Sequence, residues 1–182
     1  MLRTKSTKGL TAYERKLREY YWKCLISEFS KVFIFLIIFM SLQITKEYFI
    51  ALLFLMVLRN SGGGLHCNHY TSCLIVSFFF LCSSILLSME LQPTRVILCI
   101  CTILGGIISY YLVPITSSNR PQATSAQIIK SKRNTTIIIF IVFILMLTCP
   151  LNTYLYIGFW TIMLHTIQLL VAFFIKEVKK NA

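Results

Sequence analysis

The sequence predicts an all-α, polytopic integral membrane protein with about six transmembrane helices, the second of them short, and an N-terminal amphipathic interfacial helix. The 182-residue chain is 57% hydrophobic and has a mean hydropathy of +0.74, well above the values of soluble domains. Its apolar residues come in long blocks, and its basic residues gather at the boundaries of these blocks. Such charges are typical of topology determinants beside anionic lipid, and nucleic-acid binding is not favoured. We expect one membrane-embedded domain over residues 1–182.

Residues 1–30 are expected to form a basic tail followed by an amphipathic helix. Between Leu10 and Ser30, apolar and aromatic side chains recur at three- and four-residue steps, while charged side chains occupy other positions. This division is typical of a helix with two distinct faces. Since the segment is rich in tyrosine and basic residues, we expect it to lie along the membrane surface. No cleavable signal peptide is expected.

Six apolar runs follow between residues 29 and 175, and each is interpreted as a transmembrane helix. A full span needs about 20 apolar residues. The second run has only 11, so its helix must be short, tilted or surrounded by a locally thinned bilayer. The runs are Phe29–Thr45, Tyr48–Leu58, Cys73–Met89, Val96–Ile115, Thr135–Cys149 and Tyr154–Ile175.

The positive charges distinguish six spans from five, in which the first two runs would form one interrupted span. With six spans, all basic residues except Lys46 and Arg95 fall on one side of the membrane. The positive-inside rule therefore favours six spans, with both termini in the cytosol. The polar segment 114–134 is then a long cytosolic loop on the same side as residues 59–73. Residues 176–182 are expected to be a basic cytosolic tail.

Between the second and third runs, residues 59–73 form the polar segment R-N-S-G-G-G-L-H-C-N-H-Y-T-S-C. Such a segment is costly at membrane depth unless protein or water surrounds it, which makes it the candidate functional site. Within it, His66 and Cys73 predict a Cys–His dyad. The imidazole can take the thiol proton and leave a thiolate, which is the nucleophilic form of cysteine.

A dyad of His66 and Cys73 places conditions on the local fold. On one straight helix, seven residues span about 10 Å, which is too far for the roughly 3 Å contact that a base must make. His66 must therefore lie on non-helical or bent chain, which the preceding glycines permit. Thr71 or Ser72 can cap the following helix. Cys73 then lies in the first turn, where the helix dipole stabilises a thiolate.

The histidines and cysteines of this segment also fit two other arrangements, a different base and a zinc site. His69 lies four residues before Cys73 and is an alternative base, while Asn68 is the nearest neutral group that could orient the imidazole. A zinc site of His66, Cys67, His69 and Cys73 lacks the usual C-x₂-C spacing. No metal or other cofactor is therefore expected.

The other cysteines and one histidine lie within or beside apolar runs. Buried cysteine behaves as a small hydrophobic residue, and we interpret these cysteines in that way. His165, in the last run, is interpreted as a hydrogen-bonded histidine that packs between helices.

The residues of the polar segment resemble those of the AgrB (accessory gene regulator B) family. The shared pattern is an arginine followed by G-G-x-H-x₆-C, between short hydrophobic spans of a basic membrane protein of this length. The resemblance implies that His66 and Cys73 are the catalytic pair. It also implies that Arg59, Gly63 and Gly64 bind substrate or support the site.

A second stretch carries the same resemblance. The segment Y-Y-L-V-P-I-T-S-S-N-R-P is similar to the family's A-P-x-x-x-x-N-K-P, so Arg120 and Pro121 stand where the family has Lys-Pro. One departure is Cys67, which follows the histidine where the family often has a small residue. It places a second thiol beside the predicted dyad.

The resemblance covers essentially the whole chain and implies a multi-pass cysteine endopeptidase of the bacterial plasma membrane. Such an enzyme cleaves a quorum-sensing propeptide, an AgrD-like precursor, on the cytosolic side through a cysteine thioester. It then promotes cyclisation to a thiolactone or lactone autoinducing peptide. The expected partners are this precursor and anionic membrane lipid, with a homodimer as a further option. The alternative is a non-enzymatic membrane peptide transporter, in which the polar loop lines a pathway.

Overall fold

The computed structural model describes residues 12–64, 70–114 and 124–181. Within these ranges the regular elements are all α-helices, which confirms the predicted all-α class. The helices are α1 Ala12–Ser41, α2 Thr45–Gly62, α3 Tyr70–Glu90, α4 Arg95–Leu112, α5 Ser125–Thr148 and α6 Thr153–Asn181.

The chain divides into two units, residues 1–43 and 44–182. In the first, α1 is one helix of 30 residues that joins the expected amphipathic segment to the first apolar run. Lys31 and Glu28, one turn apart, form an ion pair of 2.7 Å on it. Because the two segments form one helix, the interfacial helix is not a separate element, and its place at the membrane surface stays a prediction.

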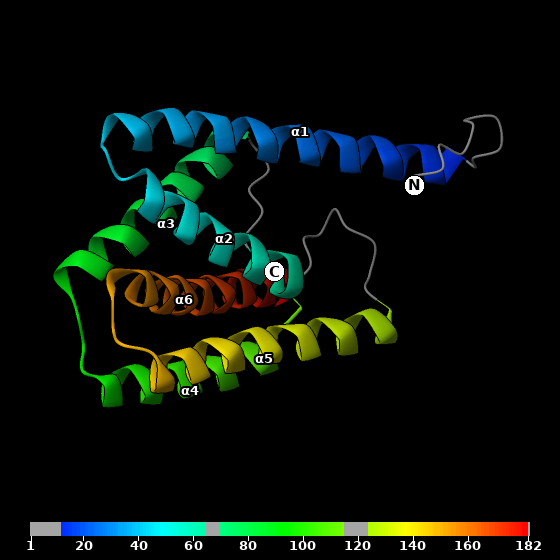
Figure 1. Ribbon diagram of the computed structural model, residues 1–182. Helices are drawn as coiled ribbons and strands as arrows, with labels where there is room; N and C mark the ends of the chain where they lie inside the picture. Colours follow the sequence, from blue (N-terminus) through cyan, green and yellow to red (C-terminus); the bar gives the residue numbers. More distant parts are fainter. Residues whose placement is uncertain (1–11, 65–69, 115–123, 182) are drawn as a thin grey trace, which may run out of the picture. The chain divides into compact units, whose positions relative to one another are not determined.

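In the second unit, α6 packs against α2, α3, α4 and α5. Figure 1 shows α6 (orange to red) running between α2 and the pair formed by α4 and α5. Apolar side chains from four helices meet around it and form a buried core: Leu58, Leu98, Ile139, Val142, Met146, Tyr156, Phe159 and Ile162. The central position of α6 allows it to hold residues from several helices in one place.

Polar side chains join the helix ends at one end of this bundle. Arg95, at the start of α4, donates hydrogen bonds to the carbonyls of Leu147 and Cys149, at 2.8 and 3.0 Å. These carbonyls lie at the end of α5, where the helix dipole favours a positive charge. The indole of Trp160 on α6 donates to the carbonyl of Leu91, after α3, at 3.0 Å.

Among the described residues, three helical segments are long and apolar enough to cross a membrane: α3, α4 and residues Thr153–Ile175 of α6. Large apolar side chains are exposed on their outer faces, Val96 and Phe174 among them. A soluble protein rarely exposes apolar surface to this extent. These helices therefore indicate association with a membrane, while the count of six spans stays a prediction.

One boundary differs from the predicted loop. The loop 114–134 was expected to be irregular, but α5 begins at Ser125. The reason is a capping box: the Gln127 N–H donates to the Thr124 side chain, and the Gln127 side chain accepts from the Thr124 N–H. The sequence T-S-A-Q carries this signal, since a threonine three residues before a glutamine typically starts a helix.

Candidate functional site

The end of α2 forms the first part of the candidate site. The helix ends at Gly62, and Gly63 follows with a φ of 79°. A positive φ favours glycine, because the Cβ of any other residue would be strained there. The Gly63 N–H donates to the Arg59 carbonyl at 3.0 Å and closes the helix end. Helix α2 thus ends at the glycines. The predicted dyad needs such an end, because His66 can reach Cys73 only from non-helical or bent chain.

Residues 62–64, which we name the glycine turn, lie directly against α6. A methyl group added at Gly62 would lie 3.1 Å from Nε2 of His165, and one added at Gly64 would lie 3.4 Å from Oε1 of Gln168. The Arg59 side chain is beside the turn, with Nε 3.8 Å from the same added methyl at Gly64. Both glycines therefore let the main chain approach polar side chains of α6 closely.

Helix α5 also holds the end of α2. The Ser131 hydroxyl donates a hydrogen bond to the main-chain carbonyl of Ser61, in the last turn, where a helix leaves its carbonyls unpaired. One turn further along α5, Thr135 is buried, and its Oγ1 lies 3.7 Å from a methyl added at Gly62. The glycine turn is therefore in contact with both α5 and α6.

Cys73 lies in the first turn of α3, as predicted, and its side chain is 9% exposed. The predicted cap is wrong: because α3 already begins at Tyr70, Thr71 and Ser72 are inside the helix, where both are exposed. The first turn of a helix presents N–H groups and the positive end of the dipole. Cys73 therefore lies in the helix turn that the sequence predicted for it.

Several predicted site residues lie outside the described residues. They are His66, Cys67, Asn68, His69, Arg120 and Pro121. Of the predicted set, the structure describes Arg59, Gly63, Gly64 and Cys73. The contact between His66 and Cys73 consequently stays a prediction.

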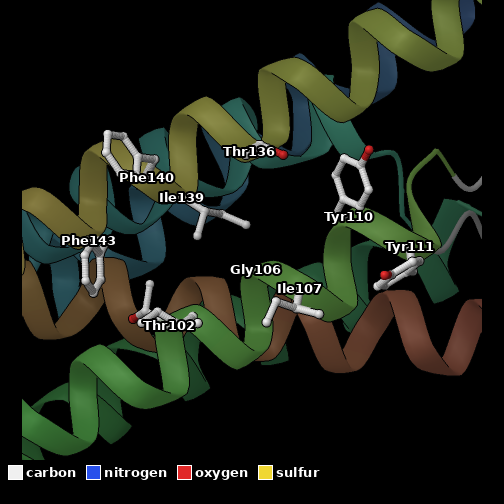
Figure 2. A pocket seen from close by; sticks show the side chains of 10 residues that line it. Thr102, Gly106, Ile107, Tyr110, Tyr111, Thr136, Ile139, Phe140 and Phe143 are labelled. Carbon is white, nitrogen blue, oxygen red and sulfur yellow. The ribbon is translucent and has the colours of Figure 1, made fainter.

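A groove of about 440 Å³ lies between α4 and α5. Figure 2 shows Tyr110 and Tyr111 at one end and Phe143 near the other. The lining is mostly apolar and aromatic. The ammonium of Lys132 lies 5.0 Å from the centre of the Tyr110 ring, within the range of a cation–π interaction. The groove thus combines an apolar lining with a positive charge at one end.

Comparison with known proteins decides the family. The sequence model of accessory gene regulator B, AgrB, matches residues 3–169. The chain belongs to the AgrB family. This confirms the resemblance drawn from the polar segment and the loop. No curated protein and no solved structure matches the chain.

The sequence did not predict which polar side chains lie against the glycine turn. His165 is buried, as expected, but neither of its ring nitrogens has a hydrogen-bond partner among the described residues. Thr135 and Gln168 were not singled out at all. The available signal was weak: both are polar residues near or within long apolar runs, and Gln168 follows His165 by three residues, which puts them on one helix face.

Proposed function

We propose that this AgrB family member is a membrane cysteine endopeptidase that processes a quorum-sensing propeptide. Cys73 is the nucleophile and His66 is the general base and acid. The substrate is an AgrD-like precursor, cleaved on the cytosolic side of the bacterial plasma membrane. The product is a cyclic thiolactone or lactone peptide.

The observation that carries this proposal is the position of Cys73 in the first turn of α3. Membership of a family that processes autoinducing peptides supports it, as does the end of α2 at the glycines before His66. In the proposed mechanism His66 supplies the base that the Cys73 thiol needs in order to act as a nucleophile.

In the first step, His66 takes the proton of Cys73, and the thiolate attacks the carbonyl carbon of the scissile peptide bond. The C–N bond then breaks, and the protonated His66 gives its proton to the departing amine. The part of the precursor before this bond remains on Cys73 as a thioester. The energy of the peptide bond is thus retained in an activated acyl group.

In the second step, a cysteine or serine side chain of the bound precursor attacks the thioester. His66 takes the proton of this group and returns it to the Cys73 thiolate as the ring closes. Water competes with this attack, and a site enclosed by protein at the membrane disfavours hydrolysis. Main-chain N–H groups of the glycine turn are candidates for stabilising the negative oxygen of both steps.

The remaining predicted residues act on binding or support. Arg59 is beside the glycine turn, where its charge can hold an acidic group of the precursor or anchor the end of α2 at the interface. Gly63 and Gly64 shape the turn. Arg120 and Pro121 are assigned to substrate binding or structural support by the family pattern.

Co-expression with the small open reading frame beside the gene tests the proposed function. Mass spectrometry should find a shortened, cyclised peptide that is absent without this protein. A peptide transporter, the alternative, has no need of a reactive thiol. Alkylation of Cys73 should therefore abolish cleavage of the precursor, whereas transport that continues unchanged after the same alkylation, with no cleavage before it, would favour the transporter.

The proposed topology predicts a labelling pattern. A membrane-impermeant thiol reagent applied from outside should label Gln92→Cys, between α3 and α4, because this loop is expected outside. The same reagent should not label Ser125→Cys, at the start of α5, until the membrane is permeabilised. Both positions are exposed, so burial does not explain a difference. Labelling of Ser125→Cys but not of Gln92→Cys from outside would contradict the proposed topology.

Anionic lipid is the proposed occupant of the groove between α4 and α5, with an acyl chain against the apolar lining and the phosphate near Lys132. Replacing Lys132 with glutamine should remove roughly 1 kcal/mol of the stabilisation that phosphatidylglycerol gives over phosphatidylcholine. Lys130→Gln is the matched control, because Lys130 is exposed, whereas Lys132 lies over the ring of Tyr110 at one end of the groove. Thermal unfolding in vesicles of the two lipids measures the difference. Equal effects of the two variants would exclude a site at Lys132.

A further inference from the structure

Four buried polar atoms on α5 and α6 lack hydrogen-bond partners among the described residues. They are Oγ1 of Thr135, Nδ1 and Nε2 of His165, and Oε1 of Gln168. A buried polar atom without a partner costs free energy, and folded proteins leave few of them. Four such atoms in one region of an apolar helix bundle therefore call for a physical reason.

These atoms lie against the glycine turn. Nε2 of His165 is 3.1 Å from a methyl added at Gly62, and Oγ1 of Thr135 is 3.7 Å from the same point. Oε1 of Gln168 is 3.4 Å from a methyl added at Gly64. His165 and Gln168 are one turn apart on α6, so they meet two alternate residues of the turn. Donors and acceptors on α5 and α6 thus lie within reach of main-chain peptide groups.

Other polar side chains in the same part of α6 behave differently. Thr161 and Thr166 are also buried, yet their hydroxyls donate to the carbonyls of Ile157 and Ile162 in their own helix, at 2.7 and 2.9 Å. Threonines in membrane helices commonly satisfy their hydroxyls in this way. The unpaired atoms of α6 belong instead to His165 and Gln168, the two residues whose side chains lie against the glycine turn.

We propose that His165 and Gln168 are positioning residues for the peptidase reaction. Their unpaired atoms, with the Thr135 hydroxyl, hydrogen-bond to main-chain groups of the glycine turn when the precursor is bound. This fixes the chain that leads from Gly64 to His66. The proposal rests on the proposed function, because it assigns these residues an effect on the His66–Cys73 reaction.

The physical basis is the accuracy that catalysis requires. Hydrogen bonds of an active site are often incomplete without substrate and form in the complex. A displacement of about 1 Å in a catalytic group can cost about 10²-fold in rate. A turn with three glycines has wide conformational freedom, so contacts on α6 are needed to select one conformation.

The first experiment replaces the imidazole of His165 with an apolar ring of similar shape. In the full-length protein in vesicles, with the precursor as substrate, His165→Phe should lower kcat about 10²-fold and change KM by less than about threefold. His165→Gln, which keeps a donor and an acceptor, should recover about tenfold of this loss. Thr161→Val is the control, since the Thr161 hydroxyl donates to the carbonyl of Ile157 in its own helix, and it should keep the original kcat.

The second experiment tests the contact itself. Gly62→Ala should lower kcat, because its methyl would press on His165 and Val113. In the Gly62→Ala background, His165→Phe should lower kcat by much less than about 10²-fold, because the two substitutions disrupt the same contact. Gly158→Ala is the control: its methyl would lie 2.7 Å from Cζ of Phe54, another close contact of α6 with α2. That variant should lower the yield of folded protein while leaving kcat per folded molecule unchanged.

The outcomes separate this proposal from the proposed function. If Cys73→Ala is inactive while His165→Phe and Gln168→Leu keep the original kcat, the positioning role is wrong and the peptidase stands. If these variants change only the folded yield, measured by size-exclusion chromatography, the role is merely structural and the proposal fails. If Cys73→Ala still cleaves, the proposed function itself is wrong.

Discussion

Replacing Cys73 with alanine should abolish cleavage of the precursor. Loss of a catalytic nucleophile costs roughly 10⁴-fold or more, because no other group can form the covalent intermediate. Cys73→Ser should be nearly as inactive, since a hydroxyl has no readily accessible anion at neutral pH. The measurement is the rate of precursor cleavage per folded molecule in vesicles.

Cys67→Ala is the matched control for this prediction. Cys67 is a second thiol in the same polar segment, so its removal tests which sulfur reacts. We expect Cys67→Ala to keep most of the activity. Activity that survives Cys73→Ala but disappears in Cys67→Ala would assign the nucleophile to Cys67.

The second large effect is expected for His66→Ala. General acid–base catalysis contributes about 10²- to 10⁴-fold, and here one imidazole serves both the activation of Cys73 and the protonation of the leaving amine. Cleavage should therefore fall by this factor, while binding of the precursor to the variant should be retained. Rates from single-turnover experiments, with binding measured separately, distinguish these two quantities.

His69→Ala decides between the two histidines of the polar segment. His69 is four residues before Cys73, but the family pattern and the glycines favour His66. His69→Ala should therefore cleave at close to the original rate. If His69→Ala is inactive and His66→Ala is active, the base has been assigned to the wrong residue.

The helices were predictable because apolar runs mark their central parts. Their ends were less predictable, since hydropathy does not report where a polar helix end stops. The second run covers Tyr48–Leu58, whereas α2 covers Thr45–Gly62, because polar residues on both sides continue the helix until Gly63. At α5 the missed signal was the Thr124–Gln127 capping box, which adds a polar first turn to an apolar helix.

The candidate site was predictable where residue type alone restricts the chemistry. A histidine, a cysteine and glycines between apolar helices predicted a reactive thiol. The structure places Cys73 in the first turn of α3, as predicted, while the dyad itself stays a prediction. The position of His165 and Gln168 beside the glycine turn was not predictable in the same way. They lie about 100 residues away from the glycine turn in the sequence, and only the packing of α6 against α2 brings them together.

The packing of α6 against the glycine turn places the proposed catalytic thiol and its supporting residues within a helix bundle suited to a membrane. The central helix α6 supports the core and also meets the glycine turn. Its residues His165 and Gln168 lie against the turn, while exposed apolar side chains such as Phe174 suit a lipid environment. Protein contacts, rather than water, would then set the conformation of the chain beside the proposed nucleophile.

The thioester on Cys73 is the central claim, and mapping it by mass spectrometry tests the account most directly. A precursor whose cyclising cysteine or serine is replaced with alanine should leave the acyl group on the enzyme, because the second step is blocked. The peptide containing Cys73 should gain the mass of the precursor part before the cleaved bond, and neutral hydroxylamine should remove it. Cleavage by Cys73→Ala, or an adduct on Cys67 instead, would contradict the mechanism.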